Sequence, residues 1–386
     1  MTLRVALVHD WLTASGGAER VLAELLALFP QADVFTLFGS TEALPRSAPA
    51  VTHLSKSWLA SIPGMSRHYR AFAPLMPNAI ESMRLEGFDL VISSSWAFAH
   101  GIRKPSGAKH LAYIHSPMRW AWDMEAEYLQ QSGLEGKTLV GKTVEFLVRW
   151  QLAKLRRWDR SAGQRPDALV ANSAFVQQRI QNCWGRQSEV IYPPVTLPAD
   201  WNTCAPKITP AKQTQRPYLS LSRLVPYKRV DAWIEAFRGM PDRQLLIAGD
   251  GPERARLEQL APPNVTFLGW VSEAEAQRLL RTSRGYLQAS KEDFGISVVE
   301  AQANGLPVLA YGVGGAQETV RDAGKHGMDR PTGLLIDNLE PHALVRAVDA
   351  FERIAFRPED CRAHAERFSG ERFRASVEAM VDRLIT

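Results

Sequence analysis

Two basic side chains follow a short apolar run near the middle of the chain. The run 218–221 has the composition of a β-strand, and Arg223 and Lys228 come directly after it. Arginine offers a planar fork of N–H donors and lysine a compact positive charge, so both match the oxygens of a diphosphate. We therefore interpret this turn as a diphosphate-binding turn, with a solvated basic turn as the alternative.

Two glutamates frame a turn between a predicted strand at 285–288 and a predicted helix. Glu292 follows the strand closely, and Glu300 lies on the helix that Gly295 and Ile296 open. Carboxylates accept hydrogen bonds from sugar and ribose hydroxyls. The backbone N–H groups at the start of the helix attract a phosphate. Two glutamates at this spacing also occur by chance, so their place at a strand-to-helix turn carries the interpretation.

Glycines mark two more turns of the same kind. Gly16 and Gly17 separate a strand at 4–9 from a helix, so the backbone there can approach a ligand closely. A second glycine-rich turn, 312–315, follows the strand predicted at 308–310. The first turn is not GxGxxG and has no Walker lysine. A purely structural turn is the alternative for both.

These turns belong to a strand–helix alternation that runs through both halves of the chain. Short β-rich runs occur at 4–9, 34–38, 90–94, 111–115, 168–171, 190–192, 218–221, 244–248, 266–268, 285–288, 308–310 and 334–336. Helical periodicity separates them, as in 17–29 and 139–158. In the latter the pattern places on one side Val140, Val144, Leu147, Val148 and Leu155. The alternation predicts the α/β class, with doubly wound parallel sheets and ligands beyond the carboxyl ends of strands.

The length of 386 residues suggests two domains. We expect an N-terminal Rossmann-like domain at 1–200, a proline-rich linker at 201–217 and a second Rossmann-like domain at 218–365. The remaining segment, 366–386, is predicted to be a helix, and packing back on the N-terminal domain is one arrangement open to it.

The composition is that of a globular protein, with 45% hydrophobic and 23% charged residues. No apolar run approaches the ~20 residues of a membrane span, and the N-terminus is predicted to be a strand, not a signal peptide. Cys183, Cys204 and Cys361 are widely spaced, which favours free thiols in a reducing, cytoplasmic compartment without structural zinc. The diffuse basic excess and the lack of a known binding module disfavour nucleic acid.

Four features resemble, in this order, the family 4 retaining glycosyltransferases: the Gly16–Gly17 turn, the Arg223/Lys228 pair, the Glu292/Glu300 pair and the segment GLPV at 305–308. The resemblance covers nearly the whole chain and is strongest over 217–337. It implies the GT-B fold, in which two Rossmann-like domains face a central cleft. The segments 113–123, 157–159, 171–173 and 190–195 are similar to bacterial mannosyltransferases that build O-antigen and other polysaccharides.

The resemblance implies a role for each candidate residue. Arg223 and Lys228 would hold the donor diphosphate and stabilise the leaving charge, while Glu292 would contact the donor sugar and Glu300 the ribose. The donor-binding set is Gly16, Gly17, Arg223, Lys228, Val271, Glu292, Phe294, Gly295, Ile296 and Glu300.

On the acceptor side, the resemblance implies that His115 lies near the anomeric carbon and the incoming acceptor, together with Arg119. A hydrogen-bonded core histidine is the alternative for His115. The implied catalytic residues are His115, Glu292, Arg223 and Lys228.

The expected reaction is transfer of a sugar, mannose from GDP-mannose, to a glycan or polyprenyl-linked glycan in polysaccharide or lipopolysaccharide biosynthesis. The sequence has no Asp-x-Asp at a strand end and no metal-spaced His/carboxylate cluster, so we expect no metal and no cofactor beyond the nucleotide sugar. A UDP-sugar donor, a GT-B sugar-nucleotide epimerase and a non-enzymatic nucleotide-sugar binding protein are the alternatives.

The basic excess lies in the first half of the chain. Residues 1–190 hold 21 Lys+Arg and 16 Asp+Glu, a net charge of +5, whereas residues 191–386 hold 25 of each. The stretch 53–84 interleaves basic with apolar residues: Lys56, Arg67, Arg70 and Arg84 with Trp58, Ile62, Met65, Tyr69, Phe72, Leu75 and Met76. Such a surface suits an anionic membrane at the inner face of the plasma membrane. The alternative is that its apolar residues fill the first domain's core.

Overall fold

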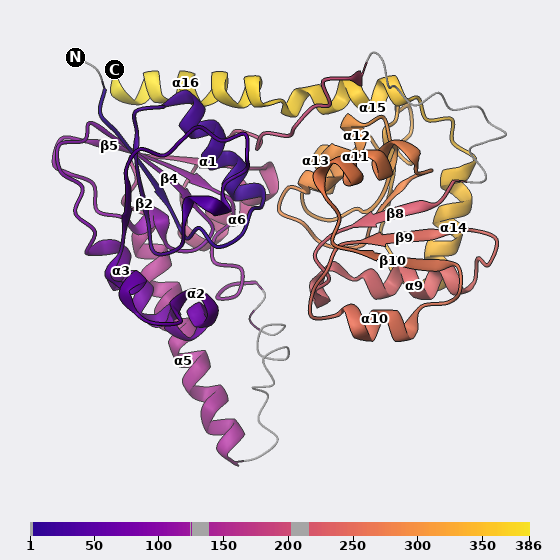
Figure 1. Ribbon diagram of the computed structural model, residues 1–386, viewed down its shortest axis with the longest axis horizontal. Coiled ribbons are helices and arrows are strands. Elements are labelled where there is room, and N and C mark those ends of the chain that lie inside the picture. The colour runs from indigo at the N-terminus through magenta and orange to yellow at the C-terminus, as the bar shows by residue number, and fades with distance from the viewer. Residues whose placement is uncertain (1–2, 124, 126–138, 202–215) are drawn as a thin grey trace. The chain divides into compact units, whose positions relative to one another are not determined.

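The computed structural model of the chain describes residues 3–123, 125, 139–201 and 216–386. It contains two compact units, Met1–Pro194 with Glu371–Thr386 and Val195–Gly370, which are described in turn (Figure 1). Most of the predicted linker at 201–217 lies outside the described residues. Among the described helices, none is long and apolar enough to cross a membrane.

A seven-stranded parallel sheet forms the first unit, in the order β3-β2-β1-β4-β5-β6-β7. Its strands are β1 (Val5–His9), β2 (Asp33–Thr36), β3 (Leu54–Lys56), β4 (Leu90–Ser95), β5 (Lys109–Ile114), β6 (Ala168–Ala171) and β7 (Glu189–Val190). Its helices include α1 (Gly17–Leu28), α2 (Met65–His68), α3 (Met76–Glu81), α5 (Leu139–Ala162), α6 (Ala174–Trp184) and α16 (Gly370–Ile385), with the short 3-10 turns η2 (Trp58–Ser61), η3 (Tyr69–Leu75) and η4 (Ala99–Gly101). Strands added outward on both sides of β1 make this a doubly wound sheet.

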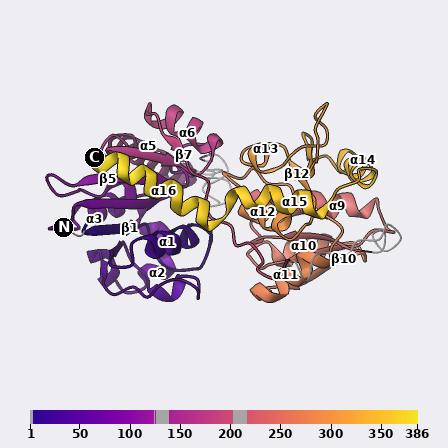
Figure 2. The same ribbon diagram turned by 90° about the horizontal axis from the view of Figure 1, so that it is seen from above.

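Both faces of this sheet are buried. Along β1, Ala6 and Val8 belong to one hydrophobic cluster with residues of α3 and α5, whereas Val5 and Leu7 belong to another with residues of α1 and α16. Figure 2 shows α16 running along the same side of the unit as α1. Because neither face of the strand meets water, its sequence is continuously apolar and does not alternate.

A six-stranded parallel sheet forms the second unit, in the order β10-β9-β8-β11-β12-β13. Its strands are β8 (Tyr218–Leu221), β9 (Leu245–Ala248), β10 (Val265–Gly269), β11 (Tyr286–Gln288), β12 (Val308–Tyr311) and β13 (Gly333–Ile336). Its helices are α9 (Val230–Arg238), α10 (Arg254–Leu260), α11 (Glu273–Thr282), α12 (Ile296–Ala303), α13 (Ala316–Thr319), α14 (Pro341–Glu352) and α15 (Pro358–Ala365). Trp233 and Phe237 of α9 fill one core with residues of α14, and Leu279 of α11 and Val298 of α12 fill the other.

The predicted fold class is confirmed, because both units are Rossmann-like and parallel. The edge strand β3 was not predicted, since Leu-Ser-Lys is too short and polar to give a strand signal. The predicted apolar side of the helix over 139–158 is wrong at Leu147, which is 53% exposed, while Leu155 is buried and Val148 packs against the core. The side chains of Val140 and Val144 lie outside those described.

The basic and apolar stretch 53–84 divides between core and surface. Its buried or partly buried members are Met65, Met76, Ile62, Tyr69 and Phe72, which all belong to or pack against the core of the first unit. Trp58 and Leu75 are exposed, at 44% and 42%. The four basic side chains are exposed as well. Most of the apolar residues thus serve the core, as the alternative interpretation expected.

One buried carboxylate holds the turn that follows β4. Asp10, directly after β1, accepts the backbone N–H groups of Trp96, Ala97, Phe98 and Ala99 at 2.6, 3.0, 2.6 and 2.7 Å. These four amides begin the turn into η4 and would otherwise be orphaned in a dry environment. The end of β1 and the end of β4 are therefore fixed to each other.

We expect Asp10→Asn to destabilise the first unit by about 2–4 kcal/mol, because the new amide N–H₂ group faces two backbone N–H groups that lose their acceptor. The measurement is urea denaturation followed by far-UV circular dichroism. Glu86→Gln, at an exposed position of the same unit, is the matched control and should stay within ~0.5 kcal/mol of wild type. Equal midpoints for Asp10→Asn and Glu86→Gln would contradict this role.

Candidate functional site

In the second unit, three neighbouring strands deliver the predicted residues to one edge of the sheet. Arg223 and the short turn η5 (Pro226–Lys228) follow β8, Glu292 follows β11, and the glycine turn follows β12. The strands lie in the order β8-β11-β12 and are parallel, so their carboxyl ends emerge together. The structure therefore brings together the residues that the sequence singled out in this half.

The centre of this edge is an ion pair. The Nζ of Lys228 donates to Oε1 of Glu292 at 2.6 Å, and the hydroxyl of Ser290 donates to the same oxygen at 2.6 Å. Both charged side chains are largely buried, at 19% and 15% exposure. Burial opposes the charged form of Lys228, but the Glu292 carboxylate prevails and raises the pKa of the ammonium group. Lys228 is therefore a fixed positive charge.

Arg223 lies nearby in sequence but has a different environment. Its side chain is exposed and makes no hydrogen bond or ion pair with any described residue. An arginine left in this state keeps all five N–H donors available for an incoming anion. The same turn thus carries one pre-positioned cation and one uncommitted cation.

Glycines allow two backbone segments to touch beneath Glu292. A Cβ on Gly314 would lie 2.2 Å from the carbonyl oxygen of Glu292, and one on Gly315 would lie 2.4 Å from the backbone of Phe294. The N–H of Gly315 donates to the Glu292 carbonyl at 2.9 Å. Gly295, at φ 89°, then turns the chain into α12. The structure therefore shows that the turn 312–315 packs closely against the backbone of Glu292 and sets its position.

A second glycine pair was missed in the sequence. A Cβ on Gly249 would lie 1.9 Å from the carbonyl oxygen of Ser222, and one on Gly251 would lie 2.2 Å from that of Leu224. These close contacts fix the backbone of Ser222 and Leu224, the residues on either side of Arg223. The signal was Gly-Asp-Gly directly after the strand predicted at 244–248, a turn of the same kind as those recognised.

The other donor candidates lie at the same end of the sheet. Glu300 is half-buried in the middle of α12, and Phe294 is buried directly before that helix begins. Val271 follows β10 and packs partly against the core, next to Trp270, which is 78% exposed.

In the first unit, His115 belongs to a polar chain that sequence reasoning missed. Its Nε2 lies 2.8 Å from the hydroxyl of Ser94, the same hydroxyl lies 3.2 Å from Nδ1 of His9, and Nε2 of His9 lies 3.6 Å from Glu19. Ser94 is the second-last residue of β4, His9 ends β1, and Glu19 is in the first turn of α1. Ser94, His9 and Glu19 come from separate elements, so no local sequence motif indicates that they lie around His115.

The surroundings of His115 keep its imidazole neutral. Burial lowers the pKa of its imidazole to about 3, and the nearby His9 acts in the same direction. A neutral imidazole has one donor and one acceptor nitrogen. The side chain is half-buried and hydrogen-bonded, and it stands at the carboxyl end of β5. A role of His115 at the acceptor stays a prediction.

Arg119 and the glycines Gly16 and Gly17 also lie at this end of the first sheet. Arg119 is half-buried in the turn that follows His115. Gly16 precedes α1, and a Cβ on it would lie 3.0 Å from Oε2 of Glu19, so the space above Glu19 suits a residue without a side chain.

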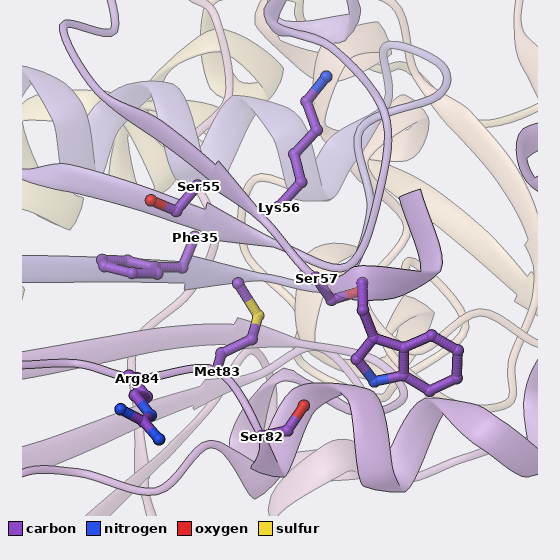
Figure 3. A pocket seen from close by; sticks show the side chains of 8 residues that line it. Phe35, Ser55, Lys56, Ser57, Ser82, Met83 and Arg84 are labelled. Carbon is purple, nitrogen blue, oxygen red and sulfur yellow. The ribbon is translucent and has the colours of Figure 1, made fainter. Parts of the chain in front are cut away.

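A pocket of about 290 Å³ lies beside the edge strand β3, away from these residues. Figure 3 shows it between Trp58 on one side and Arg84 on the other. Its lining residues are Phe35, Ser55, Lys56, Ser57, Trp58, Ser82, Met83 and Arg84. The pocket contains members of the 53–84 stretch but none of the predicted donor or acceptor residues.

Solved structures of the same fold are GT-B glycosyltransferases. Anabaena Alr3699/HepE in complex with UDP has a TM-score of 0.67 and 19% identity, covering 99% of this chain and 100% of that one. The sucrose-phosphate synthase of Thermosynechococcus elongatus has a TM-score of 0.68 and 19% identity, covering 99% of each. At this identity the likeness shows the fold.

Two family models divide the chain between them. The model described as Glycosyltransferase Family 4 matches residues 15–197, and the one described as Glycosyl transferases group 1 matches residues 205–368. The chain belongs to the family 4 glycosyltransferases.

Curated relatives match over part of their length. A GDP-mannose-dependent monoacylated alpha-(1-6)-phosphatidylinositol monomannoside mannosyltransferase of Corynebacterium glutamicum is 30% identical over 59% of this chain and 65% of its own. A GDP-mannose-dependent alpha-(1-6)-phosphatidylinositol monomannoside mannosyltransferase of Mycolicibacterium smegmatis is 28% identical over 55% and 60%. The chain thus spans less than two thirds of the length of these relatives.

The depressed pKa of His115 predicts a pH-dependent stability. Between a pKa of about 3 in the folded state and about 6.5 in the unfolded state, only the unfolded state binds the proton. The free energy of unfolding should therefore fall as the pH drops from about 6.5 to about 4, with no contribution from this group above that range. His115→Gln should show a shallower slope in urea denaturation, whereas exposed His53→Gln should keep the wild-type slope. The same slope in all three proteins would contradict the assignment.

Proposed function

We propose that the protein transfers a hexose, with mannose from GDP-mannose as the donor, to a hydroxyl of a glycan or polyprenyl-linked glycan. The observation that carries this proposal is that two cations lie at one sheet edge beside the N-terminus of α12. Lys228 is paired with Glu292, and Arg223 makes no hydrogen bond or ion pair with a described residue. The relatives named as GDP-mannose-dependent mannosyltransferases support the choice of donor.

The reaction places its charge on the diphosphate. The bond between C1 of the sugar and the diphosphate oxygen breaks, and the electron pair stays with that oxygen. A new bond forms between C1 and the acceptor oxygen, whose proton passes to a phosphate oxygen. Lys228, which is already held in place by Glu292, and Arg223, whose donors are available, would then stabilise the negative charge as it develops.

The carboxylates recognise hydroxyls in this proposal. Glu292 would accept hydrogen bonds from the donor sugar while its other oxygen keeps Lys228 in place, and Glu300 would accept them from the ribose. Phe294, Gly295 and Ile296 would present backbone to the donor at the start of α12. By family resemblance Val271 stands near the base and Gly16 and Gly17 near the phosphates or sugar.

On the acceptor side, we assign His115 and Arg119. A neutral His115 can hold a hydroxyl by a hydrogen bond but does not supply positive charge. Its orientation is set by Ser94, which His9 contacts in turn. The same resemblance suggests that configuration at C1 is retained.

We propose that no metal takes part. Among the described residues there is no group of three or more His, Cys, Asp or Glu that could hold one. Two side-chain cations and a helix N-terminus offer positive charge in its place.

A UDP-sugar donor is the second candidate, because a structure with the same fold is named as a complex of Alr3699/HepE with UDP-glucose. An epimerase would need several acids and bases around the sugar, and the proposed sugar contacts offer one of each, Glu292 and His115. We place the enzyme in polysaccharide or lipopolysaccharide biosynthesis, in the cytoplasm and at the inner face of the plasma membrane, where nucleotide sugars and polyprenyl-linked acceptors meet.

Release of nucleoside diphosphate should test the transfer directly. With GDP-mannose, UDP-glucose or UDP-galactose, we expect release to rise on adding acceptor with GDP-mannose, and to persist in excess EDTA. Glu292→Gln should lower turnover while free GDP still binds. Release without acceptor dependence, an absolute need for Mg²⁺ or Mn²⁺, or wild-type turnover in Glu292→Gln would each contradict a part of the proposal.

The contributions of Arg223 and Lys228 to nucleotide binding can be measured with single variants. Arg223→Ala and Lys228→Ala should each weaken GDP binding by an order of magnitude or more, since a charge-assisted hydrogen bond contributes roughly 1.5–3 kcal/mol. Isothermal titration calorimetry measures the effect. Arg223→Ala is the cleaner variant, because Lys228→Ala also removes the cation of the ion pair with Glu292. Arg346→Ala, an exposed arginine on α14, is the control. Unchanged affinity in both site variants would refute the clamp.

A further inference from the structure

The long helix α5 is anchored to the first unit along part of its length. Its described buried side chains are Leu152, Leu155, Asp159 and Ala162, all in the second half of the helix. In the first half, Val148 packs partly against the core. Figure 1 shows this first half extending beyond the sheet of its unit.

Large apolar side chains stand on the opposite side of α5. Phe146 is 68% exposed and Trp150 is 47% exposed, and the adjacent Leu147 is 53% exposed. Lys142 precedes Phe146 by four residues and Lys154 follows Trp150 by four, so the four side chains follow one another along one side of the helix. The ammonium of Lys154 lies 3.5 Å from the centroid of the Trp150 ring. We call Lys142, Phe146, Trp150 and Lys154 the outward stripe.

Some basic residues of α5 form ion pairs with described residues, and others do not. Residues 139–157 hold five basic residues and one acidic residue, a net charge of +4. Arg149 pairs with Glu125 at 2.8 Å and with Glu145 at 2.9 Å, and Arg156 also pairs with Glu125. Lys142, Lys154 and Arg157 form no ion pair with a described residue. The unneutralised charge therefore coincides with the exposed aromatic rings.

We propose that the outward stripe docks the protein on an anionic bilayer surface. Aromatic rings of this kind enter the headgroup region, while lysines keep their charge at the level of the lipid phosphates. The attraction between basic residues and anionic lipids adds to the burial of the rings. A second copy of the chain is a poorer occupant, since a twofold interface would bring the stripe lysines of both copies together without acidic partners.

This surface differs from the stretch 53–84, whose apolar residues mostly serve the core. The outward stripe combines exposed rings on one helix with lysines that form no ion pair with the described residues. The proposal concerns binding, so it does not depend on the proposed transfer reaction.

The test uses the full chain and sedimentation with vesicles. We expect binding to phosphatidylcholine vesicles that contain about a third phosphatidylglycerol, weaker binding at high salt and little binding to phosphatidylcholine alone. Lys142→Glu with Lys154→Glu should lower the partition coefficient roughly tenfold or more. Phe146→Ala with Trp150→Ala should lower it as well. Lys56→Glu with Arg67→Glu places the same charge change on the 53–84 stretch and should retain most of the binding.

Several outcomes would overturn the proposal. They are absence of wild-type binding at low salt, wild-type binding in the Lys142/Lys154 variant, or an equal loss in the Lys56/Arg67 control. A doubled mass in light scattering that Phe146→Ala with Trp150→Ala abolishes would assign the stripe to a second copy instead. Circular dichroism checks the fold of each variant. GDP affinity should stay at the wild-type value in the stripe variants, which separates this result from a failure of the proposed function.

Discussion

The strands of both sheets run parallel, so within each sheet all the carboxyl ends emerge at one edge. This direction decides which side chains can act together. Arg223, Glu292 and the turn 312–315 lie far apart in sequence, yet they follow strands that are neighbours in the sheet. In the first unit, His9, Ser94 and His115 are grouped for the same reason at the ends of β1, β4 and β5. Positions in the middle of these strands are buried on both faces, so the polar groups of these clusters lie at the strand ends and in the loops that follow them.

Loops that cluster at one edge must be held in place, and the two units achieve this differently. The first unit uses a charge, since the Asp10 carboxylate accepts four consecutive backbone N–H groups. The second unit uses missing side chains, because Gly249, Gly251, Gly314 and Gly315 let carbonyl groups approach to distances that a Cβ would forbid. Both devices fix the backbone beside the polar side chains, which are Ser94 in one unit and Glu292 in the other.

The sequence predicted what local patterns encode. Most strands and the fold class could be predicted from apolar runs, because buried parallel strands are continuously apolar. The same runs located the polar residues that follow the strands of the second unit. It missed Glu19, His9 and Ser94 around His115, because their grouping depends on strand order, which no local window contains. It also placed Leu147 on the inner side of its helix, since periodicity does not tell a core-facing apolar stripe from an exposed one. The turn with Gly249 and Gly251 could have been predicted, because it is a glycine turn that follows a strand, like those at Gly16–Gly17 and 312–315.

The electrostatics of the two edges differ in a way that fits the proposed reaction. At the second sheet Lys228 is kept charged by Glu292, and Arg223 is charged and unpaired among the described residues. At the first sheet burial keeps His115 neutral. In the proposed reaction the acceptor hydroxyl carries no charge, so a neutral hydrogen-bonding group suits it. In that reaction the departing diphosphate would gain negative charge, and a cation already held in place, as Lys228 is, lowers the free energy of that change because it needs no reorganisation. Burial therefore keeps His115, near neutral pH, in the form that can both donate and accept a hydrogen bond.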